Sequence, residues 1–269
     1  MNYRMIVLDL DGTLTNKDKV ITSRTKGALF ELKRQGGIIV LASGRPTYGI
    51  MPLARELELH ETGGYILSYN GGRIIDLSTG EAVFSKELPV ESNEKIIKLS
   101  KDHGVNVLTY EGDVIITPNA LDEYVQKEAF INKLKVKEVQ DMEGYAKFPV
   151  VKFMMLEEGE ILQMVEPKVK ALLGRDYSVY RSEPYFLEIL PKGIDKAASL
   201  ERLLSRLSMN KAEMIACGDG YNDLSMIEYA GLGVAMENAV LPVKKAADYI
   251  TYSNNDDGVA HVIEKFMLS

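Results

Sequence analysis

Two carboxylates stand two residues apart near the start of the chain. Asp9 and Asp11 follow the apolar residues 5–8 and precede Gly12 and Thr13. Residues i and i+2 of a strand point the same way, so both carboxylates can converge just beyond a strand that ends near Asp9. Like charges in one place need a cation or a shared proton. The pair therefore predicts a nucleophile and a proton-transferring partner at a Mg²⁺ site. A plain turn is the competing interpretation, since Asp and Gly are common turn residues.

A second acidic pair, Asp219 and Asp223, follows another apolar run at residues 214–217. Asp219 leaves the end of the predicted strand, and Asp223 faces the same point one helical turn later. Asn222 stands between them. This spacing favours metal ligation over the alternative, in which Asp223 is only an acid in the first turn of a helix.

Groups suited to holding phosphate occur elsewhere in the chain. Ser43, Gly44 and Arg45 follow an apolar run, and a hydroxyl beside free backbone N–H groups near a helix start suits a phosphate oxygen. A lysine near the start of the helix after residue 190 would screen the repulsion between a carboxylate and a phosphate dianion. We assign this role to Lys196, with Lys192 as the rival. The alternative is a solvated surface lysine.

These segments share one position, because each lies just after, or near, the end of an apolar run that predicts a strand. Alternation of such runs with helical stretches indicates β-α-β units and a parallel sheet with right-handed crossovers. Ligands of open α/β sheets bind beyond the carboxyl ends of the strands. The predicted strands of this sheet are residues 5–8, 38–42, 65–69, 186–190, 214–217 and 233–236.

The pattern changes after residue 72. Residues 73–76 and 82–86 predict a hairpin, and between residues 90 and 183 further hairpin signals are mixed with helical stretches. This mixture predicts an inserted α+β domain with an antiparallel sheet. We therefore expect a core made of residues 1–83 and 187–269, with the inserted domain at residues 84–186.

Composition limits the classes of partner. The chain has 269 residues, is 46% hydrophobic and 26% charged, and carries a net charge of −7 without a basic block, which argues against nucleic acid. No stretch approaches the roughly 18 apolar residues that span a bilayer, and the N-terminus lacks the pattern of a signal peptide. The single cysteine, Cys217, fits a reducing compartment. We expect a cytoplasmic protein that acts on a small molecule, without a membrane partner; the oligomeric state is left open.

Taken in order, these motifs resemble those of a known superfamily. Residues 9–14, residues 43–45, the later lysine and residues 218–223 resemble the four motifs of the haloacid dehalogenase (HAD) superfamily. The long insertion, the stretch 69–72 and the closing loop 254–258 look like its Cof-type (subclass IIB) phosphatases, which carry a C2B-type cap and include sugar phosphatases. The family places Gly after the third-motif lysine, whereas Ala197 stands here, so Lys192 stays open as the rival.

The resemblance implies a Rossmann-like parallel-sheet core with a cap that closes over the site, and Mg²⁺-dependent hydrolysis of small phosphorylated metabolites such as sugar phosphates. Asp9 would attack phosphorus to form an aspartyl-phosphate, and Asp11 would protonate the leaving oxygen and then activate water. Metal would be held by the Asp9 side chain, the Asp11 carbonyl and Asp219, with Asp223 acting directly or through water. The implied phosphate and substrate contacts are Ser43, Gly44, Arg45, Lys196, Asn222 and Asn70.

Two other functions remain compatible with the same motifs. One is a phosphomutase with a similar core and cap, and the other is a non-catalytic regulator that accepts phosphate or binds metal. Asp11 argues against the regulator, because a pure phosphate acceptor has no need of an acid for a leaving group. The carboxylate at position 11 favours an enzyme that protonates a leaving alcohol.

Overall fold

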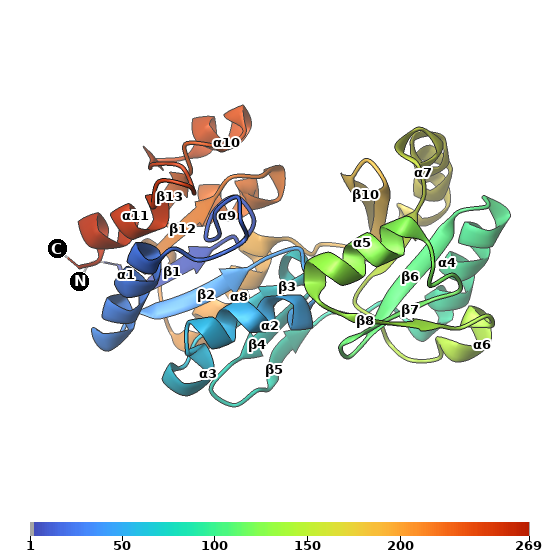
Figure 1. Cartoon of the computed structure of the whole chain (residues 1–269), viewed down its shortest axis with the longest axis horizontal. Coiled ribbons are helices and arrows are strands. Elements are labelled where there is room, and N and C mark those ends of the chain that lie inside the picture. Colours follow the sequence, from blue (N-terminus) through green and yellow to red (C-terminus); the bar gives the residue numbers. More distant parts are fainter. Residues whose placement is uncertain (1–2, 269) are drawn as a thin grey trace. The chain divides into compact units, whose positions relative to one another are not determined.

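The apolar runs form a predominantly parallel sheet whose central strand is β1 (Figure 1). The computed structural model describes residues 3–268. The strand order is β14-β13-β12-β1-β2-β3-β4-β5, with parallel pairing from β14 to β3 and antiparallel pairing of β3 with β4. The strands are β1 (Met5–Leu8), β2 (Ile38–Ala42), β3 (Tyr65–Ser68), β4 (Arg73–Asp76), β5 (Ala82–Ser85), β12 (Met214–Gly218), β13 (Leu232–Ala235) and β14 (Tyr249–Ile250).

Helices flank this sheet and complete its core. Helix α1 packs against α11, and α8 packs against α9. The strand residues of β1 and β12 are all buried, as expected for strands covered on both faces. The helices are α1 (Ser23–Arg34), α2 (Thr47–Glu56), α3 (Leu59–Thr62), α8 (Lys196–Leu207), α9 (Leu224–Tyr229), α10 (Leu241–Ala246) and α11 (Gly258–Phe266), with short 3₁₀ turns η1 (Tyr69–Gly71), η2 (Lys211–Glu213) and η3 (Tyr221–Asp223).

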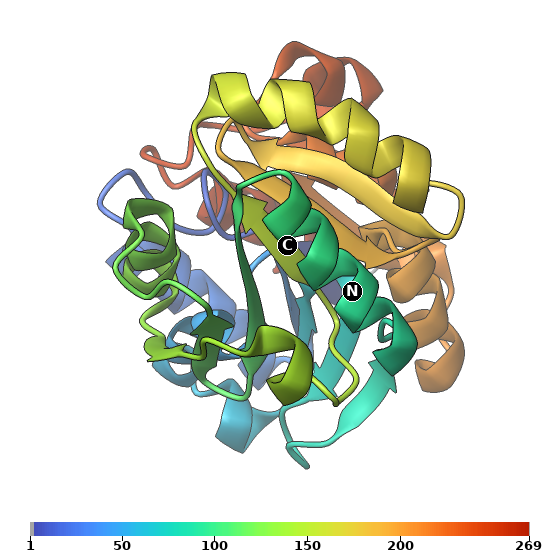
Figure 2. The same ribbon diagram turned by 90° about the vertical axis from the view of Figure 1, so that its right-hand side faces the viewer.

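A second compact unit comprises residues 85–194, and the residues before and after it form the first. Its sheet has the order β10-β11-β9-β6-β7-β8, and only β7 and β8 pair in parallel. Figure 2 shows α4 (teal green) and α7 (yellow) covering one face of this sheet. The elements are α4 (Val90–Asp102), β6 (Asn106–Glu111), β7 (Val114–Thr117), α5 (Glu123–Asn132), β8 (Lys135–Glu138), α6 (Met142–Tyr145), β9 (Phe153–Leu156), α7 (Gly159–Leu173), β10 (Tyr177–Glu183) and β11 (Phe186–Pro191).

The predicted fold class, an α/β core with an inserted α+β module, is confirmed, but one strand was assigned to the wrong sheet. Residues 186–190 were expected to resume the parallel sheet. Instead β11 pairs antiparallel with β9 and β10 inside the second unit. That unit extends to Ile194, whereas we expected the boundary at residue 186. An inner strand of any doubly covered sheet is buried on both faces, so its apolar run does not reveal which sheet it joins.

Within residues 3–268, no helix has the length and apolar character that crossing a bilayer requires. Cys217 lies in β12 and is fully buried, and burial raises the pKa of its thiol above the ordinary range. The thiol is therefore a small apolar core group rather than a reactive one.

Candidate active site

Asp9 lies directly beyond the carboxyl end of β1, at the central strand of the parallel sheet. Its backbone N–H donates to the carbonyl of Cys217 in β12 over 3.1 Å, which continues the strand pairing by one residue. The residue is only 6% exposed. One carboxylate oxygen, Oδ1, accepts a hydrogen bond from Lys196 at 2.7 Å, and the described residues make no hydrogen bond to Oδ2. Asp9 is thus fixed through one oxygen and leaves the other available.

Lys196 is the buried cation of the site. It opens α8, which is capped by Asp195 through a hydrogen bond to Ala198 N–H. Its ammonium donates to Asp9 Oδ1 at 2.7 Å, to Asp223 Oδ1 at 2.5 Å and to the carbonyl of Ala42 at 3.0 Å. A lysine ammonium has three donors, so all three are occupied. Burial alone would lower the pKa of Lys196, but Asp223 and Asp9 hold it above its ordinary value.

The rival lysine lies elsewhere. Lys192 belongs to the second unit, and its exposed ammonium donates to the backbone carbonyls of Gly174 at 3.2 Å and Arg175 at 2.8 Å. Of the two candidates, Lys196 is the one that contacts the acidic residues at the strand ends.

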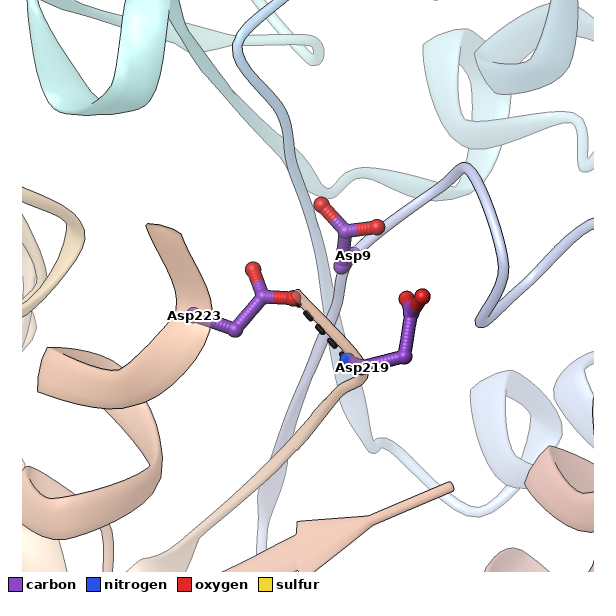
Figure 3. A group of neighbouring side chains, drawn as sticks. All are labelled: Asp9, Asp219 and Asp223. Carbon is purple, nitrogen blue, oxygen red and sulfur yellow. Dashed lines mark hydrogen bonds between the residues drawn. The ribbon is translucent and has the colours of Figure 1, made fainter. Parts of the chain in front are cut away.

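Asp223 organises the loop that carries Asp219. Its Oδ2 accepts the backbone N–H groups of Asp219 and Gly220, both at 2.9 Å, while its Oδ1 accepts Lys196. Figure 3 shows the resulting arrangement, with Asp219 beside Asp9 and Asp223 bonded to the Asp219 backbone. Both oxygens of Asp223 are therefore engaged. Asp223 fixes the backbone of the Asp219 loop and also adds negative charge to the site.

Three carboxylates therefore gather around one lysine. Oxygens of Asp9, Asp219 and Asp223 lie within 4.8 Å of one another. Burial and then Asp223 raise the pKa of Asp9 well above its ordinary value, against the lowering effect of Lys196. Burial and the neighbouring Asp223 raise the pKa of Asp219 to about 6, although a hydrogen bond from Thr13 opposes the shift. Such a cluster lacks positive charge, and a hard divalent cation with oxygen ligands would supply it.

Asp11 has a different environment from Asp9. Arg45 grips its carboxylate with two hydrogen bonds, Nε to Oδ2 at 2.8 Å and Nη2 to Oδ1 at 2.7 Å. Lys19 adds a third at 2.6 Å to Oδ1. Burial would raise the pKa of Asp11, but Arg45 and Lys19 hold it below its ordinary value. The two acids of the opening motif are thus held in different states, since Asp9 is buried with excess negative charge and Asp11 is paired with two cations.

The expected phosphate-binding residues lie after β2 and β3. Ser43 is 4% exposed, and its hydroxyl accepts the backbone N–H of Arg45 at 3.2 Å. Asn70 N–H donates to the Ser43 carbonyl at 2.9 Å, and the Asn70 side-chain carbonyl accepts Asn222 Nδ2 at 3.2 Å. A Cβ added at Gly44 would lie 3.2 Å from the Asn70 amide. These contacts bring Ser43, Gly44, Asn70 and Asn222 together, whereas the Arg45 guanidinium binds Asp11.

The segment after β3 has an unusual backbone. Tyr69 and Asn70 have φ angles of 53° and 54°, in the left-handed region that non-glycine residues rarely adopt. Gly71 follows at φ 101°, and a Cβ there would lie 2.7 Å from the carbonyl of Asp195, just before α8. Local strain of this kind persists only where surrounding contacts enforce it. Here the surrounding contacts keep Asn70 beside the loop after β2.

Two contacts of the opening motif were not anticipated from the sequence. Thr13 Oγ1 donates to Asp219 Oδ1 at 2.8 Å, which ties the first motif to the fourth. Lys19 reaches back to Asp11 from the following turn. The Thr after Asp-Gly was a visible signal for the first, but a lysine eight residues from its partner carries no local pattern.

We predict that Gly12→Ala disrupts the site beyond the cost of its backbone angle. Gly12 has φ +88°, and an added Cβ would lie 2.3 Å from Asp219 Oδ2. Gly80→Ala is the matched control, because Gly80 has φ +74° with nothing within 4 Å of its Cβ. Both variants should lose about 1–2 kcal/mol of unfolding free energy from the left-handed backbone, measured by urea denaturation. Only Gly12→Ala should lose catalytic activity, and equal activities would contradict the role of this close approach.

We also predict that the two lysines differ sharply in stability assays. Lys196→Met removes the counter-ion of two buried carboxylates and should lower the unfolding free energy by about 3 kcal/mol or more, the usual cost of breaking a buried ion pair. Lys192→Met removes two exposed hydrogen bonds and should cost about 1 kcal/mol. Urea denaturation at neutral pH with EDTA compares them. A smaller loss for Lys196→Met than for Lys192→Met would refute the assignment.

The whole chain is similar to solved structures of known proteins. A crystal structure described as a haloacid dehalogenase-like hydrolase from Bacteroides thetaiotaomicron superposes with a TM-score of 0.96 at 51% identity, covering 98% of this chain and 100% of that one. A structure described as the HAD subclass IIB sugar phosphatase BT4131 gives a TM-score of 0.80 at 25% identity, covering 99% and 100%.

Two Bacillus subtilis relatives align over nearly their whole length. The protein named "Putative phosphatase YxeH" is 33% identical and covers 99% of each chain, and 5-amino-6-(5-phospho-D-ribitylamino)uracil phosphatase YcsE is 29% identical over 100% of this chain and 97% of its own. The recognition of a HAD phosphatase family is thereby confirmed. Since the profile of the haloacid dehalogenase-like hydrolases also matches residues 6–263, the chain belongs to that family of enzymes.

Proposed function

We propose that this enzyme hydrolyses small phosphorylated metabolites, most naturally sugar phosphates, in a Mg²⁺-dependent reaction that passes through phosphorylated Asp9. The observation that carries the proposal is the state of Asp9. It is buried, held through Oδ1 by Lys196, and bears a second oxygen without a hydrogen bond among the described residues. A carboxylate fixed in this way is oriented for attack on phosphorus.

The donor set at the strand ends fits Mg²⁺. The groups are carboxylate and carbonyl oxygens, which this hard cation prefers, and one lysine leaves the three carboxylates short of positive charge. The Asp9 and Asp219 side chains and the Asp11 carbonyl would hold the ion, with Asp223 acting through the loop that it organises. When bound, Mg²⁺ would neutralise charge on the phosphoryl group.

The chain's own residues divide the reaction into two steps. In the first, Asp9 forms a bond to phosphorus while the bond to the leaving oxygen breaks, and Asp11 gives that oxygen a proton. In the second, Asp11 takes a proton from water, whose oxygen attacks phosphorus and frees Asp9 and inorganic phosphate. Arg45 and Lys19 lower the pKa of Asp11, which favours the ionised form that the second step needs.

Phosphate recognition rests on the loops after β2, β3 and β12. We assign it to Ser43, Gly44, Asn70 and Asn222, which the contacts above bring together. Arg45 joins them in this proposal when substrate phosphate competes with Asp11 for its guanidinium. Lys196 contributes by orienting Asp9 and offsetting its charge, because its three donors are already engaged.

The names of two relatives support the proposed substrate class. BT4131 is described as a sugar phosphatase, and the named substrate of YcsE carries a phosphorylated ribityl chain, so both descriptions concern phosphate esters of polyhydroxylated carbon chains. We propose the same class for this enzyme. The single buried cysteine supports a cytoplasmic setting.

We expect Asp9→Asn to abolish turnover while the fold is kept. Losing the nucleophile should lower kcat roughly 10⁴-fold or more, whereas Asp18→Asn, on an exposed turn, should leave it unchanged. The assay measures inorganic phosphate released from a panel of sugar phosphates. Near-normal turnover by Asp9→Asn would exclude the mechanism, and an isomerised phosphate ester without free phosphate would point to a phosphomutase. A stable phosphorylated protein without turnover would point to a regulator.

Metal removal provides an independent test. Dialysis against EDTA should abolish phosphate release, because Lys196 alone does not offset the charge of three carboxylates and a phosphate group. Adding excess Mg²⁺ should restore it. Ca²⁺, which prefers more ligands at longer distances, should restore less. Full activity in EDTA would rule out the proposed Mg²⁺ site.

A further inference from the structure

Two asparagine side chains outside the four motifs hold the turn that carries Asp9 and Asp11. We call residues 9–15 the nucleophile turn. Asn238 Nδ2 donates to the carbonyl of Gly12, and Asn254 Nδ2 donates to the carbonyl of Thr15, both at 2.8 Å. Asn238 follows β13, and Asn254 lies in the loop before α11, so segments more than two hundred residues away in sequence fasten this turn.

The two asparagines are also linked directly, through the backbone of one and the side chain of the other. The backbone N–H of Asn254 donates to Oδ1 of Asn238 at 3.0 Å. An amide oxygen accepts and an amide nitrogen donates, so this bond defines which end of the Asn238 side chain faces Gly12. Its NH₂ group must point to the Gly12 carbonyl, and the contact is a directed hydrogen bond.

The loop that carries Asn238 is tied to the segment of Asp219. Met236 N–H donates to the Gly218 carbonyl at 3.1 Å, and Val240 N–H donates to the Asp219 carbonyl at 2.9 Å. Asn238 stands between these two anchors. It therefore connects the backbone of Asp219 with the backbone of the nucleophile turn.

The nucleophile turn needs such external restraint. Its own backbone bonds join Leu14 N–H to the Asp9 carbonyl at 3.1 Å and Thr15 N–H to the Leu10 carbonyl at 2.9 Å. The Gly12 carbonyl at its centre takes no part in these two bonds. Glycine is conformationally permissive, so the two peptide groups that flank Gly12 take the orientation that contacts to Gly12 impose. One of these peptide groups carries the Asp11 carbonyl.

We propose that Asn238 and Asn254 are positioning residues of the metal site, which set the nucleophile turn against Asp219. The inference rests on the proposed function, because it assigns the metal to this pair of segments. Neither asparagine touches the reacting atoms. Both act by holding oxygen ligands of two separate segments at a fixed spacing before the ion binds, which reduces the ordering required on binding.

Direct metal binding tests the proposal. The probe is Mn²⁺, titrated into metal-free protein and followed by the electron paramagnetic resonance signal of the free ion. Asn238→Ala and Asn254→Ala should each weaken Mn²⁺ binding about tenfold, the lower end of the range for residues that support metal ligands. Asn255→Ala is the matched control. Asn255 lies in the same exposed loop and accepts a backbone N–H, from Lys17 at 3.0 Å, outside the nucleophile turn.

The thermal midpoint in EDTA separates positioning from folding. The thermal midpoint should change little in all three variants. For Asn238→Ala and Asn254→Ala, the Mg²⁺ concentration that gives half-maximal activity should rise by a larger factor than the factor by which kcat at saturating Mg²⁺ falls. Unchanged Mn²⁺ affinity in both variants, with tight binding by the unmodified protein, would overturn this inference alone. If the unmodified protein did not bind Mn²⁺, the proposed function itself would fail. A large loss of thermal midpoint matching the loss of affinity would show a merely structural role.

Discussion

The ammonium of Lys196 is the one buried positive charge on which the carboxylates at the strand ends depend. It bonds Asp9 and Asp223 together with the Ala42 carbonyl, and thereby joins β1, β2 and the loop after β12 through a single atom. A buried carboxylate without a partner would protonate or force its surroundings apart. Lys196 pairs with two of the three carboxylates, so the cluster keeps an excess of negative charge that a divalent cation would offset.

The remaining contacts place groups around that ion pair rather than adding charge to it. One oxygen of Asp223 accepts backbone N–H groups of the Asp219 loop, Thr13 donates to Asp219 from the nucleophile turn, and Asn238 donates to the Gly12 carbonyl. The bonds from Thr13 and Asn238 cross between segments that are distant in sequence. The site is therefore preorganised by the sheet, which brings the carboxyl ends of β1, β2 and β12 side by side.

The two acids of the first motif illustrate how environment separates identical side chains. Asp9 loses solvent and faces other carboxylates, which raises its pKa, whereas Asp11 gains two cations, which lower its pKa. The lowered pKa of Asp11 favours its ionised form, which suits the base of the proposed second step. Arg45, whose guanidinium binds Asp11, follows directly after Ser43 and Gly44, the residues that we propose for phosphate binding.

The sequence by itself determined the parallel core, the order of its motifs and the acids at its strand ends. Apolar runs followed by Asp, Gly and Ser carry those features locally, and the structure agrees on the fold class. Only the tertiary structure decided that β11 joins the second sheet, because a buried strand has the same apolar pattern in either sheet. It also decided that Lys196 rather than Lys192 meets Asp9, that Arg45 pairs with Asp11, and that Asn238 holds Gly12. These depend on partners 34 to 226 residues apart, and no local pattern encodes which distant side chain will arrive.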